Sequence, residues 1–396
     1  MPISNRAHHL PPYIFAQIHE DIARMEQDGK TIIDLGISDP DVPPRPDILD
    51  TLCTWVRHSD SHRYPSYRGL APLRQAVAEW YLRRFGVYLD PESEVLITVG
   101  SKEALVHFAL ATVNPGQAIL VPDPGYPSYQ IPSALFGFES ILMPLIAANH
   151  FLPDFERISS TEWSRIQLGF FNYPNNPTGA MAPEEFWHQA IELAHRHQWT
   201  IVSDLAYVDI VYTGQAHSIL EYAGAREVAV ETVTFSKSYS MQGFRLAAMV
   251  GCAEILEAFY RVESQINAGV YLPIQHAGIA ALRENVTPDT LATYQKRRDF
   301  VVSSLQHRGF TVETPPATLY VWLPVPKPDT DQTFVSRLLH QYGIAVAPGV
   351  AFGPLSDRFI RIALTKPLSV LKEAFARWPA MTSTAMTPEN PPSRHP

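Results

Sequence analysis

The chain has 396 residues, 46% of them hydrophobic, which is enough for a substantial core and for two subdomains. A formal net charge of −9 without a basic stripe argues against nucleic acid as a partner, and no stretch approaches the roughly 18–20 apolar residues of a membrane span. Cys53 and Cys252 are the only cysteines and the N-terminus lacks the order of a signal peptide, so we expect a reducing, cytoplasmic setting without a disulfide framework or a cysteine-rich metal site.

The first elements in chain order are two amphipathic helices and one short strand. Residues 13–28 place apolar side chains on one helical face, and Gly29 then supplies a stop signal. The segment TIIDLGISDPD (31–41) is typical of a short strand that runs into a loop. Residues 71–86 predict the second amphipathic helix.

From residue 94 onward, short β-branched runs alternate with helical patterns. The expected helices lie at 183–199, 289–308 and 367–377, and the seven expected strands at 94–99, 118–122, 139–145, 166–172, 200–204, 228–235 and 246–250. Because strands that alternate with helices form mostly parallel sheets covered on both faces, the sequence predicts an α/β fold.

This order of elements divides the chain into parts. Residues 45–280 are expected to form a large domain around the sheet. An N-terminal arm, residues 1–44, and residues 281–378 are expected to build a smaller domain. The tail 379–396 has no apolar periodicity and is predicted to be disordered.

Polar clusters follow four of the expected strands, at the sheet edge where α/β folds bind ligands. The first is GSKEA (100–104), which opens a helix. Its backbone N–H groups and the Ser101 hydroxyl are suited to hold an anion at the positive end of the helix dipole. Alternatively, Ser101 is only an N-cap and Glu103 only complements the dipole.

The second and third clusters contain an asparagine turn and a carboxylate. The proline-bracketed turn NYPNNPTGA (172–180) can direct Asn176 at a ligand above the sheet, or it is purely structural. Asp204 ends the expected strand 200–204, and Tyr207 follows three residues later. A carboxylate at the inner end of a buried strand needs a hydrogen-bond or ionic partner, which a ligand can supply. Alternatively, Asp204 caps a helix or turn and Tyr207 only packs against its neighbours.

The fourth cluster, TFSKSYSMQGFR (234–245), places Lys237 at the end of an apolar strand. A partly desolvated lysine at the mouth of a sheet is a candidate for covalent chemistry with a carbonyl group, whereas most single lysines are solvated surface residues. Ser236 and Arg245 would complete an anion site.

Together the four clusters fit one ligand with a phosphate, a carbonyl that condenses with an amine, a phenolic oxygen and a protonated ring nitrogen. Pyridoxal 5'-phosphate has each of these groups. A lysine Schiff base with an acidic partner for the ring nitrogen is the contribution expected of the protein. The sequence therefore predicts a pyridoxal-phosphate site, and we assign no metal ligands.

The motifs YPNNPTG, SDLAY and SKSYSMQGFR, in this order, resemble those of class I/II aminotransferases, the fold-type I pyridoxal-phosphate enzymes. The resemblance covers about residues 5–378. The segments LPPYIFAQIHEDI, IIDLGISDPDVPP, HRYPSYRG and VPDPGYPSY are most similar to LL-diaminopimelate aminotransferases and their aspartate-aminotransferase-like relatives. The family resemblance implies a large domain with a mostly parallel seven-stranded sheet, a smaller α+β domain and a homodimer with shared active sites.

The resemblance also implies roles for individual residues. Lys237 would form the Schiff base and Asp204 would keep the ring nitrogen protonated. Asn176 and Tyr207 would hydrogen-bond the phenolic oxygen. The remaining implied contacts are Tyr126 on the ring face; Ser101, Lys102, Ser236 and Arg245 at the phosphate; Tyr64 at the phosphate held by the partner subunit; and Arg361, Asn176, Gly36 and Tyr13 at the substrate, with Arg361 gripping the α-carboxylate.

Three of these implied roles have alternatives. Tyr67 lies three residues after Tyr64 in the same turn, although the offset of Tyr64 from Gly69 matches the family spacing. Tyr13 can serve only to pack the arm, and Lys102 can be a solvated first-turn lysine.

Two departures from the family pattern leave the substrate open. Gln242-Gly243-Phe244 stands where the family usually has threonine or serine, then glycine and tryptophan. Pro273 stands where the plant-like diaminopimelate enzymes have an asparagine on the cofactor side.

The resemblance implies a ping-pong aminotransferase in which Lys237 is the general base. The amino group would pass from an L-amino acid, such as LL-diaminopimelate or aspartate, to a 2-oxo acid such as 2-oxoglutarate. A lyase, racemase or oxidase reaction on the same cofactor is the alternative, because fold and cofactor do not determine reaction type. A non-catalytic sensor of pyridoxal phosphate or an amino acid is the third hypothesis. Regulators with this fold carry an added DNA-binding domain, for which we expect no room before the arm helix.

Overall fold

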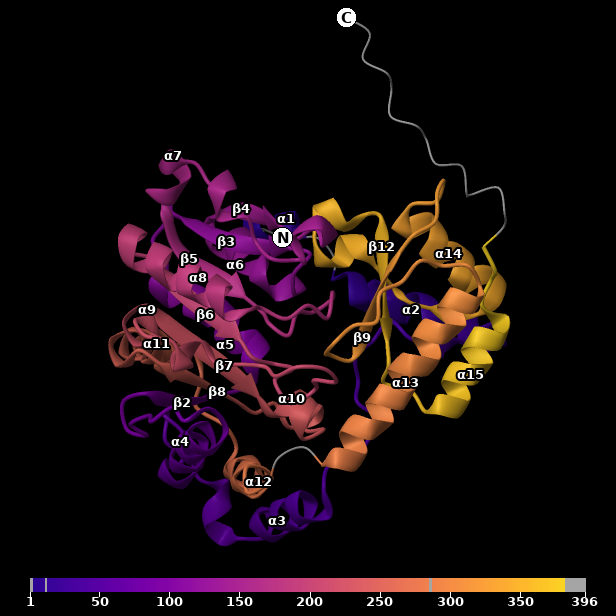
Figure 1. Ribbon diagram of the computed structural model, residues 1–396. Helices are drawn as coiled ribbons and strands as arrows, with labels where there is room; N and C mark the ends of the chain where they lie inside the picture. The colour runs from indigo at the N-terminus through magenta and orange to yellow at the C-terminus, as the bar shows by residue number, and fades with distance from the viewer. Residues whose placement is uncertain (1–2, 11–12, 285–286, 382–396) are drawn as a thin grey trace, which may run out of the picture.

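A computed structural model describes residues 3–10, 13–284 and 287–381. Within these ranges the chain forms two sheet-centred bodies that lie side by side (Figure 1). No helix in the described part of the chain is long and apolar enough to cross a membrane. The predicted disordered tail lies outside the described residues from position 382 on, and the domain boundaries stay predictions.

A seven-stranded sheet forms the centre of the larger body. Its strands are β2 (Val95–Thr98), β3 (Ala118–Asp123), β4 (Glu139–Pro144), β5 (Ile166–Phe171), β6 (Thr200–Asp204), β7 (Ala229–Thr234) and β8 (Ala247–Gly251). The spatial order is β2-β8-β7-β6-β5-β3-β4, and only β8 runs antiparallel to its neighbours. Each predicted strand is present, and the mostly parallel sheet confirms the predicted α/β fold.

Helices cover both faces of this sheet, because successive strand residues point to opposite sides. On β2, for example, Val95 and Ile97 join a core that contains Trp80, whereas Leu96 joins a second core that contains Phe108. The first core is built with α4 (Ala71–Phe85), α8 (Glu184–His197) and α12 (Leu272–Ala281), and the second with α5 (Ser101–Thr112), α6 (Ile131–Phe136) and α11 (Ala253–Ile266). Buried on both faces, the strands are nearly continuous apolar runs.

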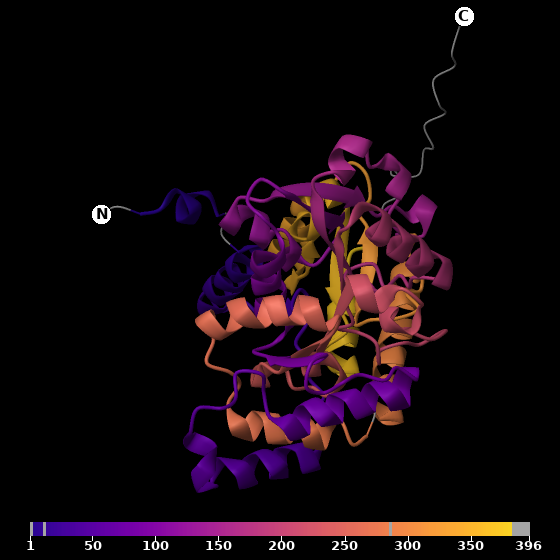
Figure 2. The ribbon, with the colours of Figure 1, turned by 90° about the vertical axis from the view of Figure 1, so that its left-hand side faces the viewer.

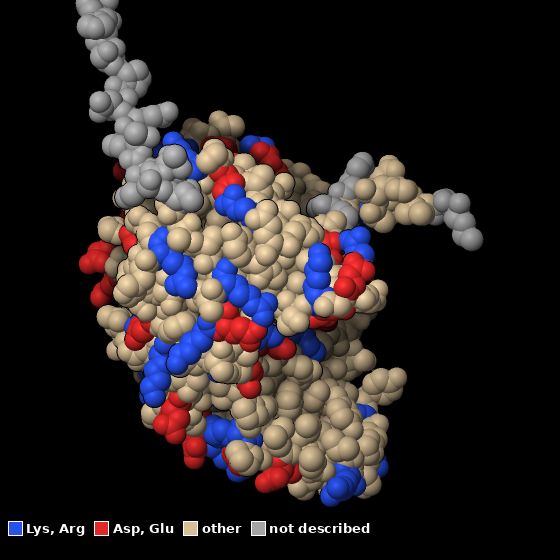
Figure 3. All heavy atoms as spheres, turned by 90° about the vertical axis from the view of Figure 1, so that its right-hand side faces the viewer, with Lys and Arg blue, Asp and Glu red and all other residues tan. Residues whose placement is uncertain are grey.

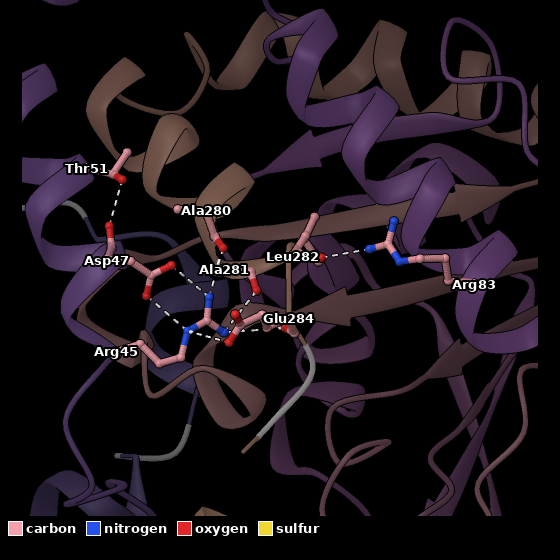
Figure 4. A network of polar contacts seen from close by, with 8 residues as sticks. All are labelled: Arg45, Asp47, Thr51, Arg83, Ala280, Ala281, Leu282 and Glu284. Carbon is pink, nitrogen blue, oxygen red and sulfur yellow. Dashed lines mark hydrogen bonds and ion pairs between the residues drawn. The ribbon is translucent and has the colours of Figure 1, made fainter. Parts of the chain in front are cut away.

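Arginines hold the end of α12 against α3 (Pro46–Val56) and α4 (Figure 4). Arg45, just before α3, donates to the main-chain oxygen of Ala280 at 2.9 Å and pairs with Asp47 at 3.0 Å. Arg83 of α4 donates to the oxygen of Leu282 at 2.8 Å. The last carbonyls of a helix have no partner within it, so these guanidinium groups satisfy them.

Two small sheets form the second body. The antiparallel sheet has the order β11 (Ala347–Pro348), β12 (Phe359–Ala363) and β9 (Tyr320–Pro324), and β1 (Ile33–Asp34) pairs in parallel with β10 (Ile344–Ala345). Their helices are α2 (Ile14–Gln27), α13 (Pro288–His307), α14 (Asp331–Tyr342) and α15 (Leu368–Arg377). Through β1, the N-terminal segment therefore lies in one body with the C-terminal part of the chain. On the outer face of this body, acidic and basic side chains are interspersed (Figure 3).

Short helices complete the described chain. They are α1 (Asn5–His9), α7 (Ser160–Trp163), α9 (Ala225–Val228) and α10 (Phe235–Ser238). The segment with α1 projects from the rest of the molecule (Figure 2). In contrast, α10 follows β7 directly and lies at the junction of the two bodies (Figure 1).

Candidate active site

A cavity of about 570 Å³ lies between the two bodies, beyond the carboxyl ends of β5, β6 and β7. This is the side of a parallel sheet at which α/β proteins bind ligands. The cavity brings together most of the residues singled out in the sequence: Tyr13, Ser101, Lys102, Tyr126, Asn176, Asp204, Tyr207, Ser236, Lys237, Arg245 and Arg361. Gly36 does not line the cavity, but its carbonyl oxygen accepts from Nη2 of Arg361, a residue that does, at 2.8 Å.

The Lys237 amine is held inside the cavity by the loop that follows β1. Its Nζ donates to the main-chain oxygen of Ser38 at 2.7 Å and to the Ser38 hydroxyl at 3.0 Å. Burial lowers the pKa of this amine below its usual value, and the charges of Arg361 and Arg245 act in the same direction. Lys237 is therefore not a solvated surface lysine, and burial shifts its amine toward the neutral, nucleophilic form.

Asp204 ends β6 with one carboxylate oxygen satisfied and the other free. Oδ2 accepts from the Tyr129 hydroxyl at 2.8 Å, whereas the buried Oδ1 has no hydrogen-bond partner among the described residues. Burial raises the pKa of Asp204 to about 6, and the hydrogen bond from Tyr129 and, to a smaller extent, the backbone N–H of Ala206 oppose that rise. A buried acceptor without a donor is unfavourable, so this carboxylate is suited to a ligand that brings an N–H group.

The turn after β5 is fastened to β6 by an asparagine that the sequence reasoning did not single out. Asn172 donates through Nδ2 to the main-chain oxygen of Asp204 at 2.6 Å, and its Oδ1 accepts from the backbone N–H of Asn176 at 2.7 Å. These bonds direct the Asn176 side chain into the cavity, where Oδ1 accepts from Arg361 Nη1 at 2.9 Å.

Arg361 reaches the cavity from β12 and is 4% exposed. Its guanidinium carbon lies 4.1 Å from the ring centre of Tyr320, 4.7 Å from that of Phe352 and 5.5 Å from that of Phe15. Nε has no hydrogen-bond partner, and no carboxylate of the described residues forms an ion pair with this side chain. A buried positive charge without a counter-ion is unfavourable, and a guanidinium fork matches a carboxylate, so the site is suited to an anionic substrate group.

The N-terminus of α5 faces Arg245. Gly100, at φ 74°, holds the cap position, so the alternative that Ser101 is the N-cap is wrong. A Cβ atom at Gly100 would lie only 2.4 Å from Arg245 Nη2, which shows how closely this guanidinium approaches the first turn of α5. With Ser236 on the same cavity wall, the helix end, two hydroxyls and one arginine form a suitable cradle for an anion.

Lys102 and Tyr13 contact one another at the rim. The Lys102 amine lies 4.2 Å from the ring centre of Tyr13. Burial and the neighbouring Arg245 lower the pKa of Lys102 below its usual value. Both residues line the cavity, so Lys102 is more than a solvated lysine and Tyr13 does more than pack the arm.

Tyr64 and Tyr67 lie away from the cavity of their own chain. Tyr64 is 86% exposed and Tyr67 47% exposed, and neither belongs to the cavity wall. Tyr64 was the predicted site residue and Tyr67 its alternative. The fold of a single chain brings neither side chain to the site.

Sequence reasoning missed several cavity residues: Phe15, Ser38, Asn172, Gln242 and Tyr320. Ser38 and Asn172 lie inside segments that had been singled out, and Gln242 had been noted only as a departure from a family pattern. Its Nε2 donates to the main-chain oxygen of Pro40 at 3.0 Å, which ties the turn before Arg245 to the loop that carries Ser38. Tyr320 offered no local signal, because it stands in an ordinary apolar strand.

The fold and the cavity together define a fold-type I transferase. The structure resembles apo-BacF from Bacillus subtilis with a TM-score of 0.92 and 33% sequence identity, covering 95% of this chain and 98% of that one. It also resembles aspartate aminotransferase from Thermotoga maritima, with a TM-score of 0.89 and 26% identity, covering 95% of this chain and 98% of that one.

Residues 30–377 match the family "Aminotransferase class I and II", and the chain belongs to this family. It is 43% identical over 380 residues to LL-diaminopimelate aminotransferase of Moorella thermoacetica, covering 95% of this chain and 97% of the relative. Identity to the LL-diaminopimelate aminotransferase of a Dehalococcoides mccartyi strain is 42%, covering 95% and 98%. The protein is thus an aminotransferase that acts on amino-acid substrates, in a family that uses pyridoxal phosphate, and the resemblance stated from its motifs is confirmed.

Proposed function

We propose that this aminotransferase binds pyridoxal 5'-phosphate and transfers an amino group from LL-diaminopimelate to a 2-oxo acid such as 2-oxoglutarate. One observation carries the proposal. Lys237, Asp204 and Arg361 share a cavity, and none forms an ion pair within the described chain. A buried amine, carboxylate and guanidinium that lack counter-ions are unfavourable unless a ligand supplies the missing charges and hydrogen bonds.

The residues present fit the cofactor. The unpartnered Asp204 Oδ1 suits the protonated ring nitrogen, and the cradle beside Gly100 suits the phosphate. The residues that would hold the cofactor are Lys237 at its aldehyde, Asp204 at the ring nitrogen, Asn176 and Tyr207 at the phenolic oxygen, Tyr126 at the ring face, and Ser101, Lys102, Ser236 and Arg245 at the phosphate. When bound, pyridoxal phosphate supplies an electron sink that stabilises negative charge at the substrate Cα.

The chain's own groups would position the substrate and move its proton. Arg361 binds the α-carboxylate, and Asn176 and the Gly36 carbonyl keep the guanidinium in one orientation. The Lys237 amine, with a pKa below its usual value, would take the proton from the substrate Cα and later return a proton to the carbon of the cofactor's aldehyde group. Release from Ser38 frees this amine for the transfer.

The proposed donor rests on the relatives that share about 40% of this sequence, since they are LL-diaminopimelate aminotransferases. The exposure of Tyr64 outside its own cavity supports a homodimer in which this tyrosine reaches the partner's cofactor phosphate. Tyr13, which lines the rim, would contact the substrate.

A donor screen tests the proposal. Purified protein loaded with pyridoxal phosphate is incubated with LL-diaminopimelate, aspartate, alanine or an aromatic amino acid, and with 2-oxoglutarate as acceptor. We expect glutamate to form fastest with LL-diaminopimelate, and the cofactor spectrum to change to that of the amine form when acceptor is omitted. Another preferred donor would contradict the substrate; pyruvate or ammonia released from a β-substituted amino acid without an acceptor would favour a lyase.

A further inference from the structure

Tyr320, at the start of β9, lies at the centre of the cavity's polar contacts. It is 1% exposed, and its hydroxyl oxygen lies 2.6 Å from that of Tyr207. Its ring centre lies 4.1 Å from the guanidinium carbon of Arg361. One side chain from the second body thus contacts both a residue proposed for the cofactor and the residue proposed for the substrate.

The contact between the two hydroxyls restricts where their protons lie. Only one proton can occupy the short line between the two oxygens, so the hydroxyl that accepts must direct its own proton elsewhere. Tyr207 lines the cavity. If Tyr320 donates, the proton of Tyr207 is therefore left free for a ligand in the cavity.

The charges around the pair favour Tyr320 as the donor. Burial alone would raise the pKa of Tyr320, but the positive charge of Arg361 beside its ring acts against burial, and the pKa lies below its usual value. Burial and the neighbouring Tyr320 raise the pKa of Tyr207 well above its usual value. The other titratable groups facing Tyr320 are Lys237, Tyr13 and Tyr126. The more acidic hydroxyl is the stronger donor.

We propose that Tyr320 is a positioning residue for amino transfer: its hydroxyl donates to Tyr207, so that the Tyr207 proton points to the phenolic oxygen of the cofactor, and its ring supports Arg361 at the substrate carboxylate. The inference rests on the proposed function of the cavity. It assigns two separable tasks to one side chain, the first to the hydroxyl and the second to the aromatic ring.

Two substitutions separate the tasks. Y320F removes only the hydroxyl, and Y320L removes the ring as well. A donor at the phenolic oxygen stabilises the anionic form, so loosening Tyr207 raises the pH midpoint of the absorption change of the lysine-bound cofactor. We expect Y320F to shift this midpoint upward by about half to one unit, the effect of one ordinary hydrogen bond. Its KM for the amino donor stays within about threefold of wild type, since the ring over Arg361 remains.

In Y320L the same spectral shift is expected, together with a KM about tenfold higher, because Arg361 loses the nearest of its three aromatic neighbours. Y294F is the matched control. Tyr294 is a buried tyrosine that packs in one apolar cluster with Tyr207 and Tyr320 but lies outside the cavity wall, and its hydroxyl has no hydrogen-bond partner among the described residues. It should change neither the midpoint nor KM, and the melting temperature of every variant verifies that it is folded.

A double-mutant cycle decides whether Tyr320 acts through Tyr207. The shift caused by Y320F should disappear in a Y207F background. A wild-type midpoint in Y320F, or an equal shift with and without Tyr207, would overturn the proposed role of the hydroxyl; an unchanged KM in Y320L would overturn that of the ring. A wild-type protein that shows no lysine-bound cofactor at all would contradict the proposed function, and with it the premise of this inference.

Discussion

Two buried acidic groups on neighbouring strands differ in how fully they are hydrogen-bonded. Glu231 of β7 accepts from the hydroxyls of Tyr81 at 2.9 Å, Ser203 at 2.8 Å and Ser218 at 2.6 Å, and from the backbone N–H of Ile219 at 3.2 Å. Asp204 of β6, in contrast, keeps one oxygen unpartnered at the cavity.

The difference separates a structural acid from a functional one. Burial raises the pKa of Glu231 to about 7 and that of Asp204 to about 6, so neither burial nor a raised pKa distinguishes them. What distinguishes them is the unmet hydrogen bond in a cavity large enough for a ligand. The same criterion distinguishes Arg361 from Arg297: Arg361 has no acidic partner in the described part of the chain, whereas Arg297 pairs with Asp41 at 2.6 Å.

The largest expected effect is on the cavity side, at the amine that shares the site with Asp204. K237A should lower kcat by about a thousandfold or more, because it removes the proposed base. Assays of glutamate formation measure the loss. K296A, on the helix α13 of the second body, is the control, and normal turnover by K237A would remove Lys237 from the mechanism.

D204N tests the functional acid directly. It should lower kcat about a hundredfold to a thousandfold, as expected when one preorganised electrostatic group is lost. Thermal unfolding of the cofactor-free protein should be unchanged or shifted to higher temperature, because a charge without a full set of partners is removed from the interior. Retained activity together with lost stability would reverse the assignment of the two acids.

E231Q is the matched change at the structural acid. An amide cannot accept all four hydrogen bonds, so the free energy of unfolding should fall by about 1–3 kcal/mol while kcat and KM remain near wild type. Denaturant unfolding and steady-state assays measure both. A large loss of activity in a folded E231Q protein would mean that the Glu231 network serves the site.

The pH dependence of stability provides a smaller effect at the same residue. The folded-state pKa of Glu231, about 7, lies above that of an unfolded glutamate, about 4.3, so its contribution is most favourable below the unfolded pKa and is lost as pH rises through 7. The difference in unfolding free energy between wild type and E231Q should therefore narrow from pH 4 to pH 7. A difference that stays constant would contradict the raised pKa.

Local sequence patterns were enough to locate the seven strands and the four motif clusters. Each cluster belongs to one strand–loop–helix segment, where apolar periodicity and turn residues act over short distances, so Asn176, Asp204 and Lys237 were found without a structure. The position of Arg361 came only from family resemblance. The domain boundaries and the roles of individual residues remain predictions.

The contacts that those residues make depend on how distant parts of the chain pack together. Ser38, Tyr320 and Arg361 come from the second body and meet Lys237, Tyr207 and Asn176 because the two bodies pack across the cavity. Local patterns carry no information on such contacts, since they join residues far apart in the chain. The unpartnered oxygen of Asp204 and the four hydrogen bonds of Glu231 likewise follow from packing. Both acids are buried, and the donors that surround each one decide whether it is available to a ligand or only supports the fold.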